Sequence, residues 1–319
     1  MKPKVYVTRK IPKKGLALVC EACDAGVWEG EVPVPREVLL DKVRGVEGLL
    51  SLLTERIDTE VLDAAPQLKV ISNYAVGFNN IDVDACTARG IPVGNTPDVL
   101  TDTTADFAFT LLMAAARRVV EAMDHVRAGK WKTWGPTTLL GQDIHDATLG
   151  IVGYGRIGKA MARRGRGFDM RVLFCDAYVT GDDADIGATK VDMDTLLAES
   201  DFVSIHVPLT EETHHLISSA ELMKMKTSAV LINTARGSVV DPQALYEALR
   251  DGAIAAAGLD VTEPEPIAMD DPLLTLPNCI IAPHIASGSV ATRDKMAEIA
   301  AKNLIAGLRG EPLPHCVNL

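Results

Sequence analysis

Two side chains late in the sequence could bind a small carboxylate substrate and exchange a proton with it, and one of two nearby glutamates could assist them. They are Arg236 and His284, with Glu263 or Glu265 lying between them along the chain. A guanidinium can hold a carboxylate through two parallel hydrogen bonds, and an imidazole can exchange a proton near neutral pH. A glutamate can hold that imidazole in the required tautomer and keep it charged. The three groups predict proton transfer on a bound carboxylate, provided that the fold brings them together.

A glycine-rich loop upstream supplies the second half of such a reaction. It reads Gly153-Tyr154-Gly155-Arg156-Ile157-Gly158, with an apolar run before it and a helical pattern after it. Gly153 permits a tight turn, Gly155 lets the backbone approach a pyrophosphate, and Gly158 lets helix and strand pack closely. The phosphates would lie at the helix N-terminus, where unpaired N–H groups favour an anion. The loop predicts a bound dinucleotide, and a nicotinamide would supply or accept a hydride.

Asp176 is the expected acidic partner of that loop. It lies 23 residues after Gly153, where the second strand of the unit should end. A carboxylate there accepts hydrogen bonds from the adenosine ribose and repels the extra phosphate of NADP, and Ala177 and Tyr178 offer no offsetting cation. We expect NAD as the cofactor, with NADH preferred and NADP possible.

Composition restricts the class of protein. A chain of 319 residues predicts about two domains, and 47% hydrophobic residues suffice for two cores. A net charge of −11 argues against nucleic-acid and anionic-membrane partners, which require basic faces. The N-terminus shows no cleavable signal, and no run of roughly 18 apolar residues predicts a membrane span. We therefore expect a cytoplasmic protein that acts on a small molecule.

The six cysteines form no recognisable framework. Only Cys20 and Cys23 make a CxxC pair, and it lies in a helix-like stretch without further nearby ligands. A zinc site needs more ligands at short range, so no metal site is expected. Scattered cysteines suit a reducing compartment.

Short apolar runs alternate with helical patterns along the whole chain. Strands are expected at 5–7, 48–52, 68–71, 149–152, 172–174, 202–206, 229–233, 256–259 and 279–281. Helices are expected at 36–43, 59–64, 83–89, 157–166 and 287–308, with one long helix at 101–126 that contains almost no breakers. This alternation predicts an α/β fold with parallel strands and right-handed crossovers.

Taken together, these segments resemble the D-isomer-specific 2-hydroxyacid dehydrogenase family over essentially the full chain. The matching motifs are residues 153–158, residues 233–237, residues 258–261 followed by Glu265, and Pro283-His284. The resemblance, and not the spacing, selects Glu265 over Glu263 as the partner of His284.

The same resemblance implies the domain plan. It implies two Rossmann-like domains, each a doubly wound parallel sheet, with a cleft between them. Residues 1–97 and 286–319 would form a discontinuous substrate-binding domain, and residues 98–285 the NAD-binding domain. Members of the family are commonly homodimers.

The family pattern also implies a set of binding residues. Arg236, Glu265 and His284 would be catalytic. Cofactor contacts beyond the 153–158 loop (Gly153, Tyr154, Gly155, Arg156, Ile157 and Gly158) and Asp176 would come from Thr104, Val207, Pro208, Thr213, Thr234, Ala235, Arg236, Asp260, His284 and Ala286.

Within the family, the chain looks most like glyoxylate/hydroxypyruvate reductases, which reduce small 2-oxoacids. Residues 73–82 resemble their substrate loop, in which the N–H groups of Val76 and Gly77 would bind the carboxylate; Asn79 departs from the usual aspartate. Residues 131–136 also resemble that subgroup. There Trp134 would reach the active site of the partner subunit, or else act only as a dimer anchor.

Other members of the same fold remain open alternatives. Residues 82–90 resemble phosphite dehydrogenase, but Val76 replaces a lysine that would hold its doubly charged oxyanion. Phosphoglycerate dehydrogenase is a second alternative. Formate dehydrogenases carry glutamine where this chain has Glu265, which argues against them. A dinucleotide-sensing corepressor is the non-enzymatic alternative.

Overall fold

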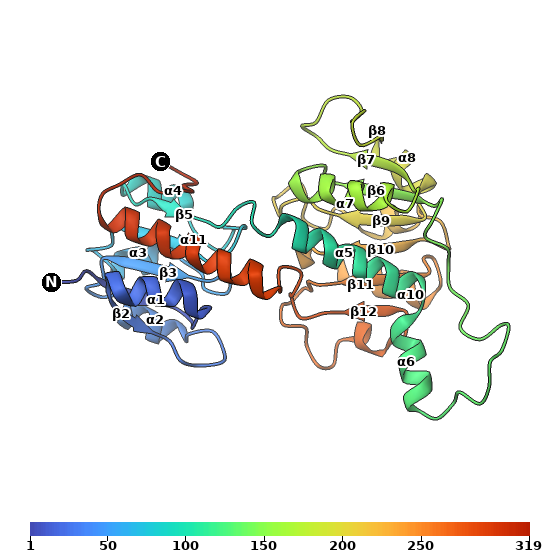
Figure 1. The fold of residues 1–319 in the computed structure, drawn as a ribbon, viewed down its shortest axis with the longest axis horizontal. Coiled ribbons are helices and arrows are strands. Elements are labelled where there is room, and N and C mark those ends of the chain that lie inside the picture. The colour runs from blue at the N-terminus through green and yellow to red at the C-terminus, as the bar shows by residue number, and fades with distance from the viewer. The chain divides into compact units, whose positions relative to one another are not determined.

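The computed structural model describes residues 1–319, which form two α/β units. The first unit comprises Met1–Leu100 and Gly288–Leu319, and the second comprises Thr101–Ser287. The chain thus changes unit after Leu100 and after Ser287, compared with the expected 97 and 285. Figure 1 labels the elements of each unit.

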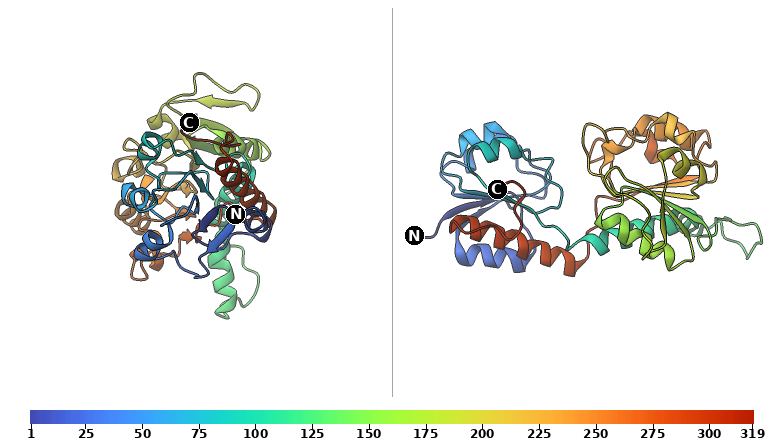
Figure 2. Two further views of the ribbon diagram at one scale, coloured as in Figure 1. Left: turned by 90° about the vertical axis from the view of Figure 1, so that its left-hand side faces the viewer. Right: turned by 90° about the horizontal axis from the view of Figure 1, so that it is seen from above.

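The first unit is built on a five-stranded parallel sheet with the strand order β2-β1-β3-β4-β5. The strands are β1 (Lys4–Val7), β2 (Asp24–Val27), β3 (Gly48–Ser51), β4 (Val70–Asn73) and β5 (Val93–Gly94). The helices are α1 (Lys13–Ala22), α2 (Arg36–Lys42), α3 (Thr59–Ala64), α4 (Val83–Ala88) and α11 (Val290–Leu308). Figure 2 shows α1 (blue) and α11 (red) side by side along one face of this sheet.

Residues from both ends of the chain build that helical layer. Gly15 of α1 packs so closely on α11 that a Cβ there would lie 2.3 Å from the carbonyl oxygen of Ala297. A side chain at position 15 would therefore force the helices apart. The opposite face is covered by α2, α3 and α4, whose buried residues include Leu39, Val61 and Cys86. The C-terminal helix is thus an integral part of the first unit.

The second unit is built on a seven-stranded parallel sheet with the order β12-β11-β10-β9-β6-β7-β8. The strands are β6 (Thr148–Val152), β7 (Arg171–Cys175), β8 (Ala188–Lys190), β9 (Phe202–Ile205), β10 (Val230–Asn233), β11 (Ala256–Leu259) and β12 (Cys279–Ile281). The helices are α5 (Thr101–Ala116), α6 (Val119–Arg127), α7 (Arg156–Arg166), α8 (Met193–Glu199), α9 (Ser219–Leu222) and α10 (Pro242–Arg250), with short 3-10 turns η1 (Gly237–Val239) and η2 (Pro272–Thr275).

Two apolar layers enclose the second sheet. One layer packs under α5 and α7 and includes Leu112, Met161 and Phe174. The other packs under α8, α9 and α10 and includes Leu196 and Leu245. Figure 2 shows helices on both faces of this sheet. The predicted α/β class with two doubly wound parallel sheets is therefore confirmed.

The expected long helix at 101–126 is wrong in one respect, because it is two helices. Arg118 adopts a left-handed backbone with φ +52° between α5 and α6. In a continuous helix, the carbonyl of Ala116 would accept a hydrogen bond from Val120. Here the N–H of Gln142 donates to it instead, at 2.9 Å. The returning chain ends α5, which local sequence could not reveal.

Smaller differences concern short elements. Strands β2, β5 and β8 were not expected, because each is short and only partly apolar. The CxxC pair straddles a helix end: Cys20 is in α1 and Cys23 is its C-cap. All six cysteines are free thiols. No helix of the structure is long and apolar enough to cross a membrane.

Candidate functional site

The residues singled out in the second unit gather at one edge of its sheet. All seven strands are parallel, so their carboxyl ends lie together. The glycine loop follows β6, and Asp176 follows β7. Arg236 follows β10, and His284 follows β12. Strand order reverses between β6 and β9, the kind of place where open α/β sheets bind ligands.

The glycine loop has the geometry that a dinucleotide requires. Gly153 has φ +92°, and a Cβ there would lie 2.8 Å from the backbone of His206. At Gly158 a Cβ would lie 2.2 Å from the carbonyl oxygen of Gly153. Nothing lies within 4 Å of a Cβ at Gly155, which is the N-cap of the eleven-residue helix α7. The loop is therefore tight where the fold needs it and open where a pyrophosphate would approach.

The side chains of the loop divide between the core and the surface. Tyr154 is fully buried, stacks on Phe174 with ring centroids 3.9 Å apart, and donates its hydroxyl to Asp183 at 3.2 Å. It can therefore offer a cofactor only backbone atoms. Arg156 and Ile157 form the first turn of α7. Thr104 is buried in α5.

Asp176 is held as an ionised carboxylate at the end of β7. Its oxygens accept hydrogen bonds from the N–H groups of Tyr154 (2.7 Å), Tyr178 (2.8 Å) and Val179 (2.9 Å). Partial burial raises the pKa of this carboxyl, but the three backbone donors outweigh it, so that the pKa is lowered overall. The carboxylate is thus fixed beside the glycine loop with negative charge.

Thr234 supplies an independent sign that a polar ligand belongs here. It follows β10, and its hydroxyl oxygen is buried without a hydrogen-bond partner. Buried polar atoms without partners are rare, and each requires an explanation. A hydroxyl at the carboxyl end of β10 would be satisfied by a bound polar group, as a nicotinamide dinucleotide would provide. The orphaned hydroxyl and the open glycine loop both fit that cofactor.

The turn that carries Arg236 is shaped by a buried amide. Asn233 is fully buried; it accepts from the N–H of Ala235 at 3.0 Å and donates to the carbonyl of Arg236 at 2.8 Å. Gly237 packs against the next loop, where a Cβ would lie 1.9 Å from the carbonyl oxygen of Thr262. The Arg236 turn and the loop that contains Glu265 are therefore in direct contact.

Arg236 is a mostly enclosed cation with an acid nearby. Its Nη1 donates to the carbonyl of Ala235 at 2.7 Å. Burial lowers the pKa of the guanidinium, and the charge of Glu265 partly offsets this. Because arginine is the most basic of the side chains, the group stays charged. Such a guanidinium favours an anionic ligand that compensates for its desolvation.

The structure pairs His284 with Glu265 and not with Glu263. The Nδ1 atom of His284 lies 2.5 Å from Oε1 of Glu265. Glu263 instead accepts from Ser238 Oγ and lies beside His215, each at 2.7 Å. The two glutamates that the residue pattern left open thus have different partners. Because its Nδ1 is engaged, His284 has Nε2 left for proton exchange.

Asp260 fixes the backbone on which His284 is mounted. It is buried at the end of β11, and its carboxylate accepts from the N–H groups of Ile285 and Ala286, each at 2.7 Å. Its carbonyl accepts from the N–H of His284 at 2.9 Å. Burial raises the pKa of Asp260, while the two N–H donors and His284 oppose that shift. His284 has φ +54°, so these bonds hold its strained backbone.

The loop after β9 is closed by a threonine. Thr213 donates its hydroxyl to the carbonyl of Pro208 at 2.6 Å and accepts from the N–H of Thr210 at 2.8 Å. Val207 lines Gly153, where its Cγ1 would lie 2.8 Å from an added Cβ. Val207 therefore borders the glycine loop, and Pro208 follows it directly in the chain.

Three predicted substrate residues have surroundings of their own in the structure. Val76 and Gly77 belong to the first unit, where Val76 accepts from the side chain of Asn95 and Gly77 from that of Asn73, both at 2.9 Å. Trp134 lies in the loop after α6 and is 78% exposed. Their roles stay predictions.

Sequence reasoning missed Asn233 and the positioning bonds of Asp260. Asn233 was visible only as a polar residue that ends an apolar strand, and Asp260 was predicted as a cofactor contact. Burial, which a single sequence does not show directly, distinguishes such residues from surface polar groups.

Comparison with known proteins places this geometry in a family. The NAD binding domain of D-isomer specific 2-hydroxyacid dehydrogenases matches residues 109–286. A glyoxylate reductase of Korarchaeum cryptofilum is 56% identical, over 100% of this chain and 96% of that protein. A solved structure from Thermus thermophilus superposes with a TM-score of 0.94 at 46% identity, covering 98% of this chain and 99% of the other.

A third relative was solved with ligands. It is the NADPH-dependent glyoxylate/hydroxypyruvate reductase of Sinorhizobium meliloti in complex with NADP and malonate, with a TM-score of 0.84 and 33% identity over 99% of this chain and 97% of that one. The chain therefore belongs to the D-isomer-specific 2-hydroxyacid dehydrogenase family, as an oxidoreductase that reduces 2-oxoacids with a nicotinamide dinucleotide.

Proposed function

We propose that this protein reduces glyoxylate and hydroxypyruvate, with NADH as the preferred reductant and Arg236, Glu265 and His284 as its catalytic residues. The observation that carries the proposal is the His284–Glu265 pair at 2.5 Å, one loop away from Arg236 at the same edge of the sheet. A small 2-oxoacid offers the carboxylate for the guanidinium and the carbonyl oxygen for the imidazole.

The mechanism assigns each side chain one task. Arg236 binds the substrate carboxylate and orients the adjacent carbonyl. NADH, held by the glycine loop and Asp176, would supply the hydride that the carbonyl carbon accepts. His284, protonated and held through Nδ1 by Glu265, donates its Nε2 proton to the carbonyl oxygen, which gives the 2-hydroxyacid. The substrate contacts predicted for Val76 and Gly77 remain predictions.

Asp176 supports the preference for NADH. A 2′-phosphate carries about −1.5 to −2 charges at pH 7, and the carboxylate beside the glycine loop is held ionised. Ala177 and Tyr178 provide no cation. The two like charges would repel each other at close range.

We also propose that the protein is a homodimer assembled through α6 and the loop after it. No residue of α6 is buried, although the helix carries Val119, Val120, Met123 and Val126. Trp131, Trp134 and Leu140 in the following loop are also exposed. Exposed apolar surface of this extent is typical of an interface.

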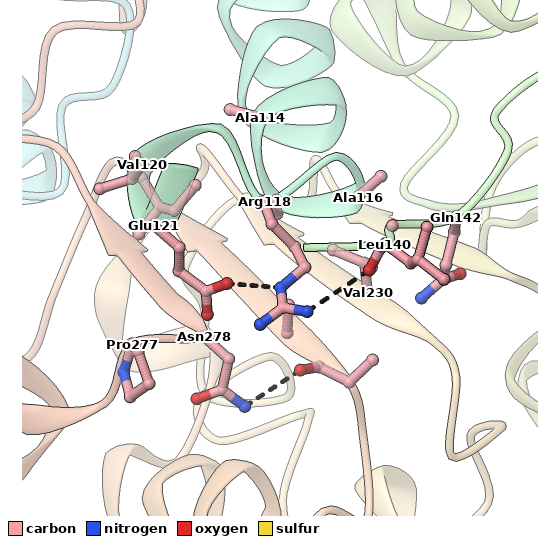
Figure 3. Close-up of a pocket in the computed structure, with 15 residues that line it drawn as sticks. Ala114, Ala116, Arg118, Val120, Glu121, Leu140, Gln142, Val230, Pro277 and Asn278 are labelled. Carbon is pink, nitrogen blue, oxygen red and sulfur yellow. Dashed lines mark hydrogen bonds and ion pairs between the residues drawn. The ribbon is translucent and has the colours of Figure 1, made fainter. Parts of the chain in front are cut away.

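A pocket at the base of α6 would belong to that interface. It has a volume of about 320 Å³ and lies at the amino ends of β10 and β11, where Val230 and Ala256 line it. It is thus at the opposite edge of the sheet from His284. Figure 3 shows Arg118 at its centre, held by Glu121 and by the carbonyl of Leu140. A second copy of the chain is the occupant that the exposed α6 surface favours.

Cytoplasmic localisation completes the proposal. Six free thiols and no disulfide suit a reducing compartment. Activity measured after cell fractionation would test this point.

A steady-state substrate panel tests the function directly. We expect turnover of glyoxylate and hydroxypyruvate with NADH, weaker turnover of pyruvate, and little or none of bulky 2-oxoacids. Strong activity on 3-phosphohydroxypyruvate or phosphite with little on glyoxylate would reject the substrate assignment but not the family. Nucleotide binding without any turnover would favour the corepressor alternative.

A further inference from the structure

Two adjacent histidines lie beside a glutamate in the loop that contains Glu265, and none of the three takes part in the proposed reaction. His215 Nε2 lies 2.7 Å from Oε2 of Glu263, and His214 Nε2 lies 3.9 Å from Oε1 of the same carboxylate. One ligand atom from each residue can be chosen so that all three lie within 4.8 Å of one another. His214 and His215 are 48 or more residues from Glu263 in sequence, so only the fold brings them together.

The backbone holds both rings on the same side. Neighbouring side chains in an extended segment point in opposite directions, but His215 has φ +50°. Its N–H donates to the carbonyl of Ser238 at 2.7 Å, which fixes that conformation. The rings of His214 and His215 stack with centroids 4.0 Å apart. Both imidazoles are therefore presented to one carboxylate.

A structural ion pair accounts for only part of this arrangement. His215 and Ser238 suffice to anchor Glu263, since they engage its two oxygens. His214 is too far from Oε1 for a hydrogen bond, and its side chain is 52% exposed. The distances from the two imidazole nitrogens to the carboxylate oxygens suit ligands of one shared ion. With metal–ligand distances of about 2.0–2.2 Å, a nitrogen and an oxygen ligand in a tetrahedral site lie about 3.3–3.5 Å apart. The observed 2.7 and 3.9 Å bracket that value.

We propose that His214, His215 and Glu263 form a binding site for a divalent transition-metal ion of the Zn²⁺ class. Two imidazole nitrogens and one carboxylate oxygen match the ligand preference of Zn²⁺, whereas Mg²⁺ and Ca²⁺ prefer oxygen ligands alone. Three protein ligands leave a fourth position for water. No metal site was expected from the sequence, where only the Cys20–Cys23 pair was weighed as a source of ligands.

A metal ion at this site would stabilise the two loops that carry the proposed catalytic residues Glu265 and Arg236. Glu263 lies two residues before Glu265, and Ser238 lies two residues after Arg236. A bound ion would join the Glu263 segment to the loop after β9, and the hydrogen bond from Ser238 to Glu263 would link the Arg236 segment to both. Binding to the folded chain alone raises stability by mass action, so the ion should raise the melting temperature. This inference does not depend on the substrate assigned above.

Calorimetric titration of the metal-free, full-length protein with Zn²⁺ tests the proposal. We expect one Zn²⁺ per chain, with no saturable binding of Mg²⁺. His214→Ala should weaken Zn²⁺ binding at least tenfold and leave the metal-free melting temperature unchanged. Glu263→Gln, which keeps the shape of the side chain, should weaken it as well.

A matched control is available on the same unit. His145 is also exposed and also lies beside carboxylates, those of Asp143 and Asp146. His145→Ala should leave Zn²⁺ affinity and the Zn²⁺-induced rise in melting temperature unchanged. The proposal is overturned if the unmodified protein shows no saturable Zn²⁺ binding, if His214→Ala binds as tightly as the unmodified protein, or if His145→Ala abolishes the binding.

Discussion

The two edges of the seven-stranded sheet carry different chemistry. At the carboxyl edge, the strands are followed by Asp176, Arg236, Asp260 and His284. At the amino edge, Val230 and Ala256 line a pocket walled by Ala114 and Ala116 at the end of α5. The difference follows from strand direction, because the helix after each strand starts at the carboxyl edge and favours anions there. Reaction chemistry thus belongs to one edge, and we assign assembly to the other.

Two histidines at the carboxyl edge, His206 and His284, differ in their surroundings. His206 follows β9 directly, and its Nε2 lies 2.9 Å from Ser204 Oγ. Burial lowers the pKa of His206 to about 4, so it is neutral near pH 7. His284 has a carboxylate beside its ring, whereas His206 has a hydroxyl. A place at this edge is therefore not sufficient for acid–base work: His206 is kept neutral by burial, and it lacks the neighbouring carboxylate that His284 has.

The largest expected effect is on kcat, and it should distinguish a substitution at the carboxyl edge from one at the amino edge. His284→Ala should lower kcat for glyoxylate reduction by roughly 10²–10⁴-fold, since the proton donor is lost. Its melting temperature should change little, because the side chain is partly exposed. Val120→Ala, at the rim of the amino-edge pocket, should change kcat far less. Similar losses of kcat in both variants, measured by NADH oxidation, would contradict the assignment of the reaction to the carboxyl edge alone.

A smaller effect tests whether the amino-edge surface also shapes the active site of a partner. If Trp134 walls the substrate site of the other subunit, Trp134→Ala should shift the kcat/KM ratio toward longer 2-oxoacids by about tens-fold, the size of one lost apolar contact. Trp131→Ala is the matched control, since that indole is also exposed, at 62%. Equal selectivity in the two variants, with light scattering still showing dimers, would show that Trp134 does not wall the substrate site of the other subunit.

Cofactor choice should respond to a single carboxyl group. Asp176→Ser keeps a hydrogen-bond acceptor near the N–H groups of Tyr154 and Val179 but removes the charge. The kcat/KM preference for NADH over NADPH should fall by about tenfold, equivalent to about 1.4 kcal/mol. Asp194→Ser, at an exposed aspartate of α8, should leave the preference unchanged. An unmodified enzyme that uses NADPH equally well would contradict the role of Asp176.

The smallest effect concerns stability and pH. Since the pKa of His206 is about 4 in the folded chain and 6.5 for an ordinary histidine, the unfolded chain binds the proton first as pH falls. Stability is therefore full above pH 6.5 and decreases as the pH falls toward 4. Because the side chain is only partly buried, we expect a loss of about 1–2 kcal/mol, below the full linkage value of about 3 kcal/mol.

Thermal unfolding between pH 7 and pH 4 checks this expectation. His206→Gln cannot take up the proton, so its melting temperature should depend less on pH than that of the unmodified protein. His145→Ala is a suitable comparison, because that histidine is exposed. Identical pH profiles for His206→Gln and the unmodified protein would show that His206 is not responsible.

Much of the fold could be predicted because its signals are local. Two of the expected helices are an example: α3 and α4 begin where Asp58 and Asp82 each accept a backbone N–H of the first turn. Apolar runs of strand length marked most of the buried strands. The break at Arg118 could not be predicted, because it depends on Gln142, which is distant in sequence.

The sequence by itself determined the family, the α/β class, the glycine loop and the types of side chain available for chemistry. Those features depend on residue type and on spacing over a few residues. The residue pattern left Glu263 and Glu265 open, and the family resemblance favoured Glu265; the tertiary structure places Glu265 beside His284, and only it united Glu263 with His214 and His215. Such pairings arise where parallel strands end side by side, and the packing of a sheet, not distance along the chain, sets which strand ends meet.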